Sequence, residues 1–540
     1  MAARESLAAM ATHAPRGGRA TLAGVAVVCG VALAALGPHV FAGGFHVDDW
    51  VDASHYYFHP GEGFWAAVRN HQDVKRDVYA VLRTAIYALF GMHTAPHLAL
   101  TALVATAEAS LLLVLLRRLG LAAAPATMAA LLLLVWPDAD STRLWSTGFQ
   151  MGLFAGLLPL AGLLVALRGL EQPGWRGAAL HGVALALYAT GVNGYELGAP
   201  MIMLFGILYV WHRPGSAARW RWAADVIVVL SLLIRYAGRH PHLPAIVGVP
   251  DHLRIIASHG LEVMARALLP VRGIPAAAVL APALAIVVAA AVAVSCPQLA
   301  VRTRVELRQA LLLLVGGLVV TVAGWGMIIP AAPGYDPGSS GVGNRINAVA
   351  AIGLAVVVVA FAGLLAIAIR ACSRRAPSLA LLTTLLAMPV ALADLVRLQQ
   401  DAANWNHAAD VGRAFLVRLR ELVPDPVPGT TLFTFGVSGY AAPSVPIFGG
   451  GGNNDLLGAV RVTYGTGAIS GFPVLGGMQF SCGPASMTLL DTRAPSTTPY
   501  GLALLVDMRG AGQVLVPQSE SDCLRETTQL APFASVNEKD

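Results

Sequence analysis

Two adjacent carboxylates, Asp48 and Asp49, follow the first long apolar segment of the sequence and precede Trp50. A carboxylate can remove a proton from a hydroxyl group, and two carboxylates together can hold a divalent cation. Ionisable groups beside a membrane-spanning segment are costly and often functional, although acidic residues can also simply begin a solvated loop. The pair is therefore a candidate general base that could also hold a divalent cation, and no other cofactor is expected.

A second candidate, Arg345, lies far along the sequence at the start of another apolar segment. A planar guanidinium is well suited to binding phosphate. The glycine-rich stretch 334–343 precedes it and would let the backbone approach a ligand closely. Arg345 is thus a candidate anion-binding residue, and the alternative is a simple ion pair with Asp336.

Further ionisable residues fall in segments that are predicted to lie on the same side of the membrane. Lys75 and Arg76 stand near the end of the first polar loop, and Glu196 follows Tyr195 at the edge of a nearly uncharged hairpin. Glu196 could face a ligand or could extend from the interface to water. One later loop contains several histidines, but their spacing is not typical of a metal site and favours solvated loop residues: His240, His242, His252 and His259.

The composition places all of these residues in an integral membrane protein. The 540-residue chain is 56% hydrophobic and 12% charged, whereas soluble domains have about 25% charged residues. The net charge of +6 comes from arginines clustered between apolar segments. This is the pattern of cytoplasmic loops, so the basic charge indicates topology, and no nucleic-acid partner is expected.

The apolar segments predict a polytopic α-helical protein in the cytoplasmic (inner) membrane, with its N-terminus in the cytoplasm. We expect a cytoplasmic segment 1–20, a transmembrane domain 21–395 and a first outer loop 45–77, with stretches 78–90 and 257–271 near the interface. About 20 apolar residues cross a bilayer. On that basis about eleven spans are expected, at 21–44, 95–116, 122–136, 147–167, 178–193, 197–211, 222–236, 274–295, 309–329, 347–369 and 378–394.

The last part of the chain, 396–540, has a different character and is predicted to be extracytoplasmic. A helical pattern extends to Leu422, and short β-prone segments such as 431–435 and 501–506 follow between Gly, Pro and Ser residues. This predicts a helix and a small β-rich domain. Outside the cytoplasm, Cys482 and Cys523 could form a disulfide bond.

Taken in order, the polar motifs resemble those of the GT-C superfamily, specifically its bacterial members with an Asp-Asp-aromatic motif after the first helix. The similarity extends over about residues 40–350. The motifs that carry it are Val47-Asp48-Asp49-Trp50, Arg76 leading to Ala88-Leu89-Phe90-Gly91, Leu115-Leu116-Arg117-Arg118-Leu119-Gly120, Trp136-Pro137-Asp138 with Leu144-Trp145-Ser146, Gly194-Tyr195-Glu196, and Gly334-Tyr335-Asp336-Pro337 with Asn344-Arg345.

This resemblance implies an inverting glycosyltransferase that moves a sugar from a polyprenyl-phosphate donor to a glycan, lipid-linked glycan or protein acceptor at the outer membrane face. It implies that Asp48 or Asp49 is the base and that the other carboxylate orients the acceptor or holds a cation. It assigns the donor phosphate to Arg345, with Arg76 or Lys75. Sugar and acceptor contacts would come from Glu196, Trp50, Trp145, Tyr335 and Asn344.

One position departs from the family pattern, because Arg76 is followed by Asp77 where relatives often have proline. Lys75 or Arg83 could therefore serve in place of Arg76. Three other classes of function also remain open. A glycan polymerase or ligase of a different fold would share the same outer-face basic and acidic residues. A lipid-glycan transporter or flippase would place charges near the bilayer midplane and usually show internal repeats. A non-catalytic envelope assembly protein would leave the ionisable residues scattered over separate surfaces.

Overall fold

The computed structural model describes residues 18–71, 76–239, 249–271, 274–295, 301–329, 335–338, 341–372, 376–436, 438–442, 445–448, 455–475, 478, 480–490 and 496–530. Most of these residues are helical. In chain order, the helices of the N-terminal and central regions are α2 (Gly18–Ala42), α3 (Asp48–Tyr57), α4 (Phe64–His71), α5 (Asp77–Phe90), α6 (Thr94–Arg118), α7 (Ala123–Val135), η2 (Pro137–Ala139), α8 (Ser141–Leu144), η3 (Met151–Leu157), α9 (Leu158–Glu171), α10 (Gly174–Gly194), η4 (Glu196–Gly198), α11 (Ala199–His212), α12 (Ser216–Arg239), α13 (Val249–Leu268), α14 (Ala276–Ser295), α15 (Val301–Gly326), η6 (Gly341–Asn347) and α16 (Ala348–Cys372).

Each of the eleven predicted spans overlaps one or two helical elements, and the last falls at the start of the 44-residue α17 (Leu379–Leu422). In the part of the chain that the structure describes, six helical segments are long and apolar enough to cross a membrane, and three shorter apolar helices accompany them. The six are Gly18–Ala42, Thr94–Arg118, Met151–Glu171, Arg304–Gly326, Gly341–Ala371 and Leu379–Leu422. A helix satisfies its own backbone hydrogen bonds, as lipid requires. The protein is therefore a helical membrane protein, and the count of eleven spans stays a prediction.

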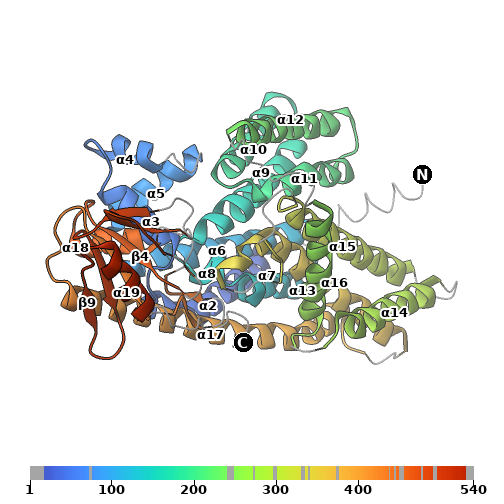
Figure 1. Cartoon of the computed structure of the whole chain (residues 1–540). Helices are drawn as coiled ribbons and strands as arrows, with labels where there is room; N and C mark the ends of the chain where they lie inside the picture. The colour runs from blue at the N-terminus through green and yellow to red at the C-terminus, as the bar shows by residue number, and fades with distance from the viewer. Residues whose placement is uncertain are drawn as a thin grey trace.

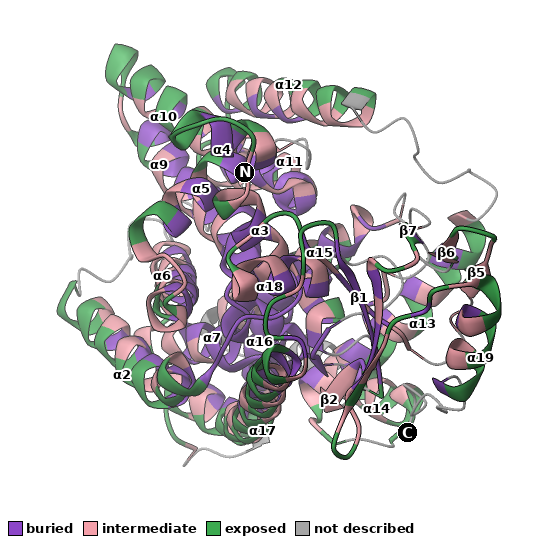
Figure 2. Ribbon diagram, turned by 60° about the vertical axis from the view of Figure 1, so that its left-hand side comes forward, coloured by how far each residue is buried: buried purple, intermediate pink, exposed green. Residues whose placement is uncertain are grey.

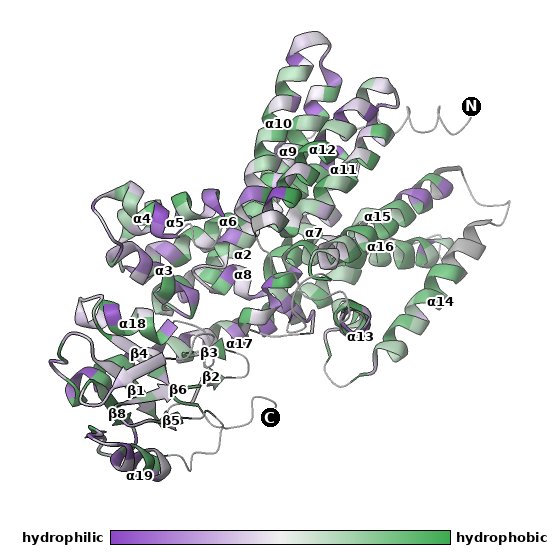
Figure 3. Ribbon diagram, turned by 45° about the horizontal axis from the view of Figure 1, so that its top comes forward, coloured by the Kyte–Doolittle hydropathy of each residue, from purple (hydrophilic) through white to green (hydrophobic). Residues whose placement is uncertain are grey.

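The apolar helices form one bundle around a shared core (Figures 1 and 3). The central segment Gly341–Ala371 is 72% buried over its most apolar window, whereas Gly18–Ala42 at the edge is only 28% buried. Figure 2 shows this difference between the centre and the edge. Helices α15 and α16 can approach closely because Gly353 has no Cβ atom. A Cβ atom there would lie 2.4 Å from the carbonyl oxygen of Gly317. Small residues at a helix contact are typical of packing in membranes.

The predicted first outer loop is mainly helical in its described part. It contains α3 and α4, and α5 follows within the stretch predicted to lie near the interface. Figure 1 shows these three helices at the end of the bundle where the C-terminal domain lies. The acidic residues Asp48 and Asp49 occupy the first turn of α3, where carboxylates are favoured by the helix dipole. The short polar helices therefore place these side chains beside the bundle.

The C-terminal domain contains a mixed sheet, where the sequence predicted a small β-rich domain. Its strand order is β4-β1-β8-β9; β1 pairs in parallel with β4 and β8, and β9 is antiparallel to β8. The predicted strand at 431–435 is β1, and the segment predicted at 501–506 contains most of β8. The elements are β1 (Thr431–Phe435), β2 (Tyr440–Ala442), β3 (Val445–Pro446), α18 (Asp455–Tyr464), β4 (Ser470–Pro473), β5 (Phe480–Cys482), β6 (Ser486–Leu489), β7 (Ser496–Pro499), β8 (Ala503–Asp507), β9 (Gln513–Leu515) and α19 (Glu520–Leu530).

Strand β1 is buried at every position because both faces of the sheet are covered. Leu432 packs into a cluster with residues of α17 and α18, and Phe433 and Phe435 pack into another with residues of β6 and α19. Successive side chains of a strand point to opposite faces, so one strand supplies both cores. Helix α18 also packs against α3, where a Cβ atom at Gly458 would lie 2.3 Å from the carbonyl oxygen of Trp50.

Helix α17 joins the bundle to this domain without interruption. It extends from Leu379 to Leu422 and therefore crosses the predicted domain boundary at 395/396. Within the bundle it packs against α2, α7 and α16, and beyond it contacts β2, β3 and α18. The sequence indicated two helical segments here, and the structure joins them into one.

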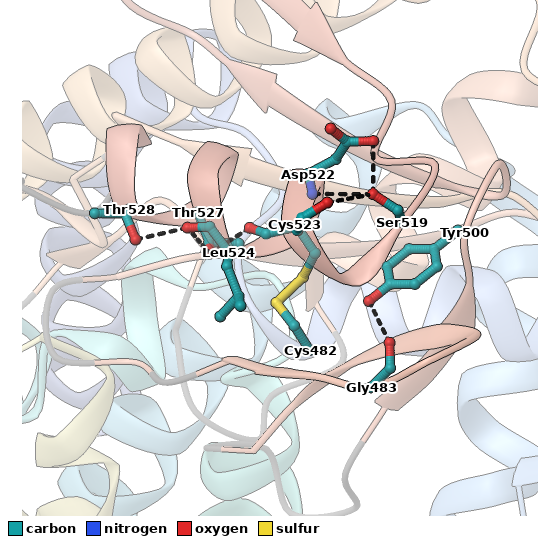
Figure 4. The surroundings of a disulfide bond; sticks show 10 residues. Cys482, Gly483, Tyr500, Ser519, Asp522, Cys523, Leu524, Thr527 and Thr528 are labelled. Carbon is teal, nitrogen blue, oxygen red and sulfur yellow. Dashed lines mark hydrogen bonds between the residues drawn. A yellow bond between two sulfur atoms is a disulfide. The ribbon is translucent and has the colours of Figure 1, made fainter.

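Cys482 and Cys523 form a disulfide bond, as the sequence suggested (Figure 4). Their Cα atoms are 6.0 Å apart, and the bond joins β5 to α19. Cys523 is fully buried in the core on that face of the sheet. The bond therefore fastens the terminal helix to the edge of the domain.

We expect Cys482→Ser to lower the stability of the C-terminal domain. The bond closes a loop with a sequence separation of 41 residues, and bonds of this kind stabilise proteins by about 2–4 kcal/mol. Thermal unfolding of the detergent-purified protein should show a lower first transition for Cys482→Ser, and reductant should lower that of the wild type equally. The unpaired Cys29 supplies the control: Cys29→Ser should unfold like the wild type and stay sensitive to reductant.

Candidate functional site

Asp48 begins α3 directly after a strained residue. Val47 has φ 42° and ψ −110°, and among the described residues it is the one non-glycine residue with a positive φ. This conformation is unusual for a β-branched residue and is tolerated where surrounding packing imposes it. The Val47 side chain is buried, whereas the side chain of Asp48 is 43% exposed. The chain thus turns sharply and presents Asp48 outward.

Asp49 points in the opposite direction and is fully buried. One carboxylate oxygen accepts hydrogen bonds from the hydroxyls of Ser146 (2.6 Å) and Thr147, and the other accepts one from the His46 backbone N–H (2.8 Å). Tyr87 donates its hydroxyl to the Asp49 carbonyl oxygen at 2.6 Å. Burial raises the pKa of Asp49 to about 6, although these donors and a nearby arginine oppose the shift. Asp49 therefore joins α3 to the segment after α8 and to α5.

Arg83 supplies the positive charge inside this region. Its guanidinium is fully buried, 2.8 Å from Asp52 and 3.7 Å from Asp49. Burial disfavours the charged form, but Asp52, followed by nearby tyrosines and Asp49, raises the pKa of Arg83 above its usual value. Tyr79 donates a hydrogen bond of 2.7 Å to Asp52. Two carboxylates and one guanidinium therefore hold α3 against α5.

Arg345 lies on η6, and a buried asparagine on either side of it fixes that short helix. Asn344 accepts a hydrogen bond from the Ser141 hydroxyl at 2.7 Å and donates one to the Asp140 carboxylate. Asn347 accepts from the Trp325 indole at 2.8 Å and donates to the backbone carbonyl oxygens of Asp138 and Pro337. These contacts position η6 before any ligand binds. They also occupy the Asn344 amide, which was a predicted sugar contact.

Asp48 and Arg345 meet at the surface of this region. A guanidinium nitrogen of Arg345 is 3.7 Å from an Asp48 carboxylate oxygen, and the Arg345 side chain is 21% exposed. The guanidinium also lies 5.6 Å from the centre of the buried Trp145 ring and interacts with Tyr195 and Tyr335. The alternative partner, Asp336, instead contacts His259 at 2.6 Å. An accessible carboxylate and an accessible guanidinium therefore share one polar surface.

Arg76 and Glu196 form a second pair next to the first. The guanidinium donates two hydrogen bonds to the carboxylate, at 3.1 and 2.7 Å, and lies 4.4 Å from the centre of the Tyr195 ring. Burial disfavours the charged form, but Glu196 and two tyrosines raise the pKa of Arg76 above its usual value. Tyr195 interacts with both Arg76 and Arg345. Both arginines therefore lie close enough to Tyr195 to interact with it electrostatically.

The remaining predicted residues are distributed differently. Trp145 donates its indole N–H to the His46 carbonyl oxygen at 3.1 Å and is fully buried. Its ring therefore packs beneath the Arg345 guanidinium on the buried side of the site. Trp50 lines a separate cavity of about 260 Å³ between the first span, α17 and the C-terminal domain, together with Arg413 and Phe448. Three of the predicted residues, Lys75, His240 and His242, lie outside the described residues.

Sequence reasoning did not single out a group formed by Asp52, His55 and His71. One potential ligand atom from each lies within 4.8 Å of the others. Burial lowers the pKa of His71 to about 4, although Asp52 opposes the shift. Asp52 and His55 are three residues apart and therefore share a helix face, which is the signal that could have revealed them. His252, which was expected in a solvated loop, instead lies in α13 and contacts two backbone carbonyl oxygens.

The raised pKa of Asp49 predicts a pH-dependent difference between the wild type and Asp49→Asn. The folded wild type keeps this proton to about pH 6, whereas the carboxyl in the unfolded chain loses it near its ordinary value of 3.8. The folded state thus binds more protons in this window, and this contribution to stability falls as the pH rises. This difference between the folded and the unfolded pKa corresponds to roughly 2–3 kcal/mol of stability.

Asparagine does not titrate, so Asp49→Asn should gain stability relative to the wild type from about pH 4 to about pH 6, and the difference should be constant above. Thermal unfolding of both proteins at matched pH values checks this, because all other groups titrate alike in both. A constant difference across the whole range would contradict the assignment. Asp410→Asn, an exposed carboxylate on α17, supplies the control with no such change.

Comparisons with protein-family models, with curated proteins and with solved structures found no match to this chain. The resemblance to GT-C glycosyltransferases therefore rests on the sequence motifs. In the structure, residues of those motifs lie together in two pairs, Asp48 with Arg345 and Arg76 with Glu196.

Proposed function

We propose that the protein is a membrane-embedded inverting glycosyltransferase that moves a sugar from a polyprenyl phosphate to a cell-envelope glycan, a lipid-linked glycan or a protein. The observation that carries the proposal is the position of Asp48 beside Arg345. Both side chains are accessible and 3.7 Å apart, and they come from segments at opposite ends of the bundle's sequence. A base and a phosphate-binding cation on one surface are what this transfer requires.

In the proposed reaction, Asp48 removes the proton from the acceptor hydroxyl. The hydroxyl oxygen forms a bond to the anomeric carbon as the bond from that carbon to the phosphate oxygen breaks. The electron pair of the broken bond leaves with the polyprenyl phosphate, and Arg345 stabilises the negative charge that remains on it. A single displacement of this kind inverts the anomeric centre.

The pairs seen in the structure suit exchange with a ligand. The charges of Asp48 and Arg345 are 3.7 Å apart and partly exposed, so a donor phosphate can replace Asp48 as the partner of Arg345. In this proposal the Asp48 carboxylate then accepts the proton of the acceptor hydroxyl. Arg76 is held nearby by Glu196 and the Tyr195 ring, and it adds positive charge to the proposed phosphate site. In this proposal Asp49 is a positioning residue, because its carboxylate is fully buried and hydrogen-bonded.

Two observations support an extracytoplasmic location for the reaction. The alternating arginine clusters of the sequence favour alternate loops in the cytoplasm, which supports an outer position for α3 and η6. The disulfide bond of the C-terminal domain favours an oxidising compartment. The domain packs against α3, so both would lie on the same side. We therefore propose a bacterial cytoplasmic membrane with the reaction at its outer face.

Deletion of the gene followed by complementation tests the proposal. Mass spectrometry of envelope glycans, lipid-linked glycans and glycoproteins from the deletion strain should show a species lacking one sugar, and the wild-type gene should restore that sugar. Arg345→Met should not restore it. Arg370→Met, which removes an arginine paired with Glu306 at the far end of α16, should restore it fully. Unchanged glycans in the deletion strain, or rescue by Arg345→Met, would overturn the proposal.

A further inference from the structure

We propose that Asp52, His55 and His71 bind a divalent transition-metal ion that fastens α4 to α3. The inference does not rest on glycosyl transfer, because it concerns a group of side chains inside the fold. Two imidazoles and one carboxylate are the ligand set of many zinc and iron sites. The residues come from two short helices separated by a stretch of loop, so a shared ion would join them.

The geometry of the three side chains suits this ligand set. Their potential ligand atoms lie within 4.8 Å of one another, and ligands of one tetrahedral zinc ion lie about 3.3 Å apart. Small rotations of the two imidazole side chains therefore close the site. The two imidazole rings are 5.4 Å apart at their centres, and the nearest carboxylate oxygen of Asp52 is 3.8 Å from Nδ1 of His71.

The second observation is that the imidazole nitrogens are buried without partners. Within the described residues, neither ring nitrogen of the fully buried His71 has a hydrogen-bond partner, and the same holds for Nδ1 of His55. A buried polar atom without a partner costs about 1–3 kcal/mol, and a bound metal ion would remove that cost. The two imidazoles are thus placed as ligands rather than as packing groups.

The surrounding contacts are those of a prepared site. The other oxygen of Asp52 accepts a hydrogen bond from Tyr79 and faces Arg83 at 2.8 Å, so the carboxylate cannot rotate freely. Asn70 donates a hydrogen bond of 2.9 Å to the His55 carbonyl oxygen and links the two helices next to the site. Contacts of this kind orient metal ligands. His55 is half-buried, whereas His71 is fully buried.

Metal analysis of the whole protein tests the inference. The protein is purified in detergent with an affinity tag that lacks histidine, treated with a chelator, and then titrated with Zn²⁺. Elemental mass spectrometry should find about one tightly bound Zn²⁺ per chain, and Co²⁺ should produce visible absorption bands of an ion with imidazole ligands. Zn²⁺ should also raise the unfolding temperature of the chelated protein.

His71→Gln and His55→Gln should each weaken Zn²⁺ binding by at least about tenfold and abolish the thermal shift. His93→Gln changes an exposed histidine at the start of α6 and should bind like the wild type. Because His55 is half-buried, His55→Gln should fold even if His71→Gln does not. Zn²⁺ binding by the chelated wild type tests the site without any substitution. Failure of the wild type to bind Zn²⁺, or unchanged binding by His55→Gln, would overturn the inference. Loss of glycosyl transfer with intact Zn²⁺ binding would overturn only the proposed function.

Discussion

Asp48→Asn should reduce the rate of sugar transfer by about 10²–10⁴-fold, because the amide cannot accept the proton of the acceptor hydroxyl. The substituted side chain has nearly the same shape, so binding of the donor should change little. The measurement is the rate of polyprenyl phosphate release from the donor that the deletion strain identifies, with the enzyme reconstituted in vesicles. The effect should fall on kcat rather than on KM.

Two controls separate this result from misfolding. The Asp48 side chain is 43% exposed, so Asp48→Asn should unfold at the wild-type temperature. Asp410→Asn removes a carboxylate that is 69% exposed on α17 and should retain full activity. If Asp48→Asn keeps more than about a tenth of the wild-type rate, the general-base role is wrong.

The second large effect is expected for Arg83→Met. This substitution leaves Asp52 and the fully buried Asp49 without the guanidinium that lies 2.8 and 3.7 Å from them. Breaking a buried ion pair from one side costs about 3–5 kcal/mol, because the remaining charge has no compensation. We expect a large fall in the unfolding temperature of the purified protein. Activity should also fall, because α3 carries Asp48 and is held by this cluster.

The matched control for Arg83→Met is Arg168→Met, which breaks a pair at a site that is 64% exposed and should cost at most about 1 kcal/mol. The double variant Arg83→Met with Asp52→Asn should recover part of the lost stability, since it also removes one uncompensated charge. An unfolding temperature of Arg83→Met equal to that of Arg168→Met would show that the cluster does not stabilise the fold.

The helices could be predicted from the sequence because each apolar segment signals its own position. Most Ala-, Leu- and Val-rich segments become helices within about four residues of their predicted ends, but α12 and α15 begin earlier than predicted and α17 extends to Leu422. Strand β1 begins and ends where predicted. The C-terminal domain was harder. Strands β1 and β4 can be parallel because α18 crosses between them, and the short segment 455–464 shows no long apolar period. Strand β9 is antiparallel to β8, which makes the sheet mixed. The division between spans and domain was also hidden, since α17 continues through it.

The site could be predicted by residue type more readily than by orientation. The sequence pointed to Asp48, Asp49 and Arg345, but it could not indicate which aspartate faces outward. That choice depends on the positive φ of Val47, which sets where α3 begins. The buried network of Asn344 could not be predicted either, because its partners Ser141 and Asp140 come from a distant segment. Long-range packing decides such contacts, and local patterns carry no information about it.

Because α17 is one continuous helix, it fixes the rotation of the C-terminal sheet relative to the bundle. Each residue of an α-helix turns the chain by about 100° and advances it by about 1.5 Å, so 44 residues form a rod about 66 Å long. The azimuth of the sheet around that rod is thus set by the number of residues between the bundle and β1. Inserting a single residue into α17 would swing α18 away from α3, whereas inserting seven, almost two full turns, would restore the angle but displace the sheet by about 10 Å. The register of one helix thereby encodes how two halves of the molecule face each other.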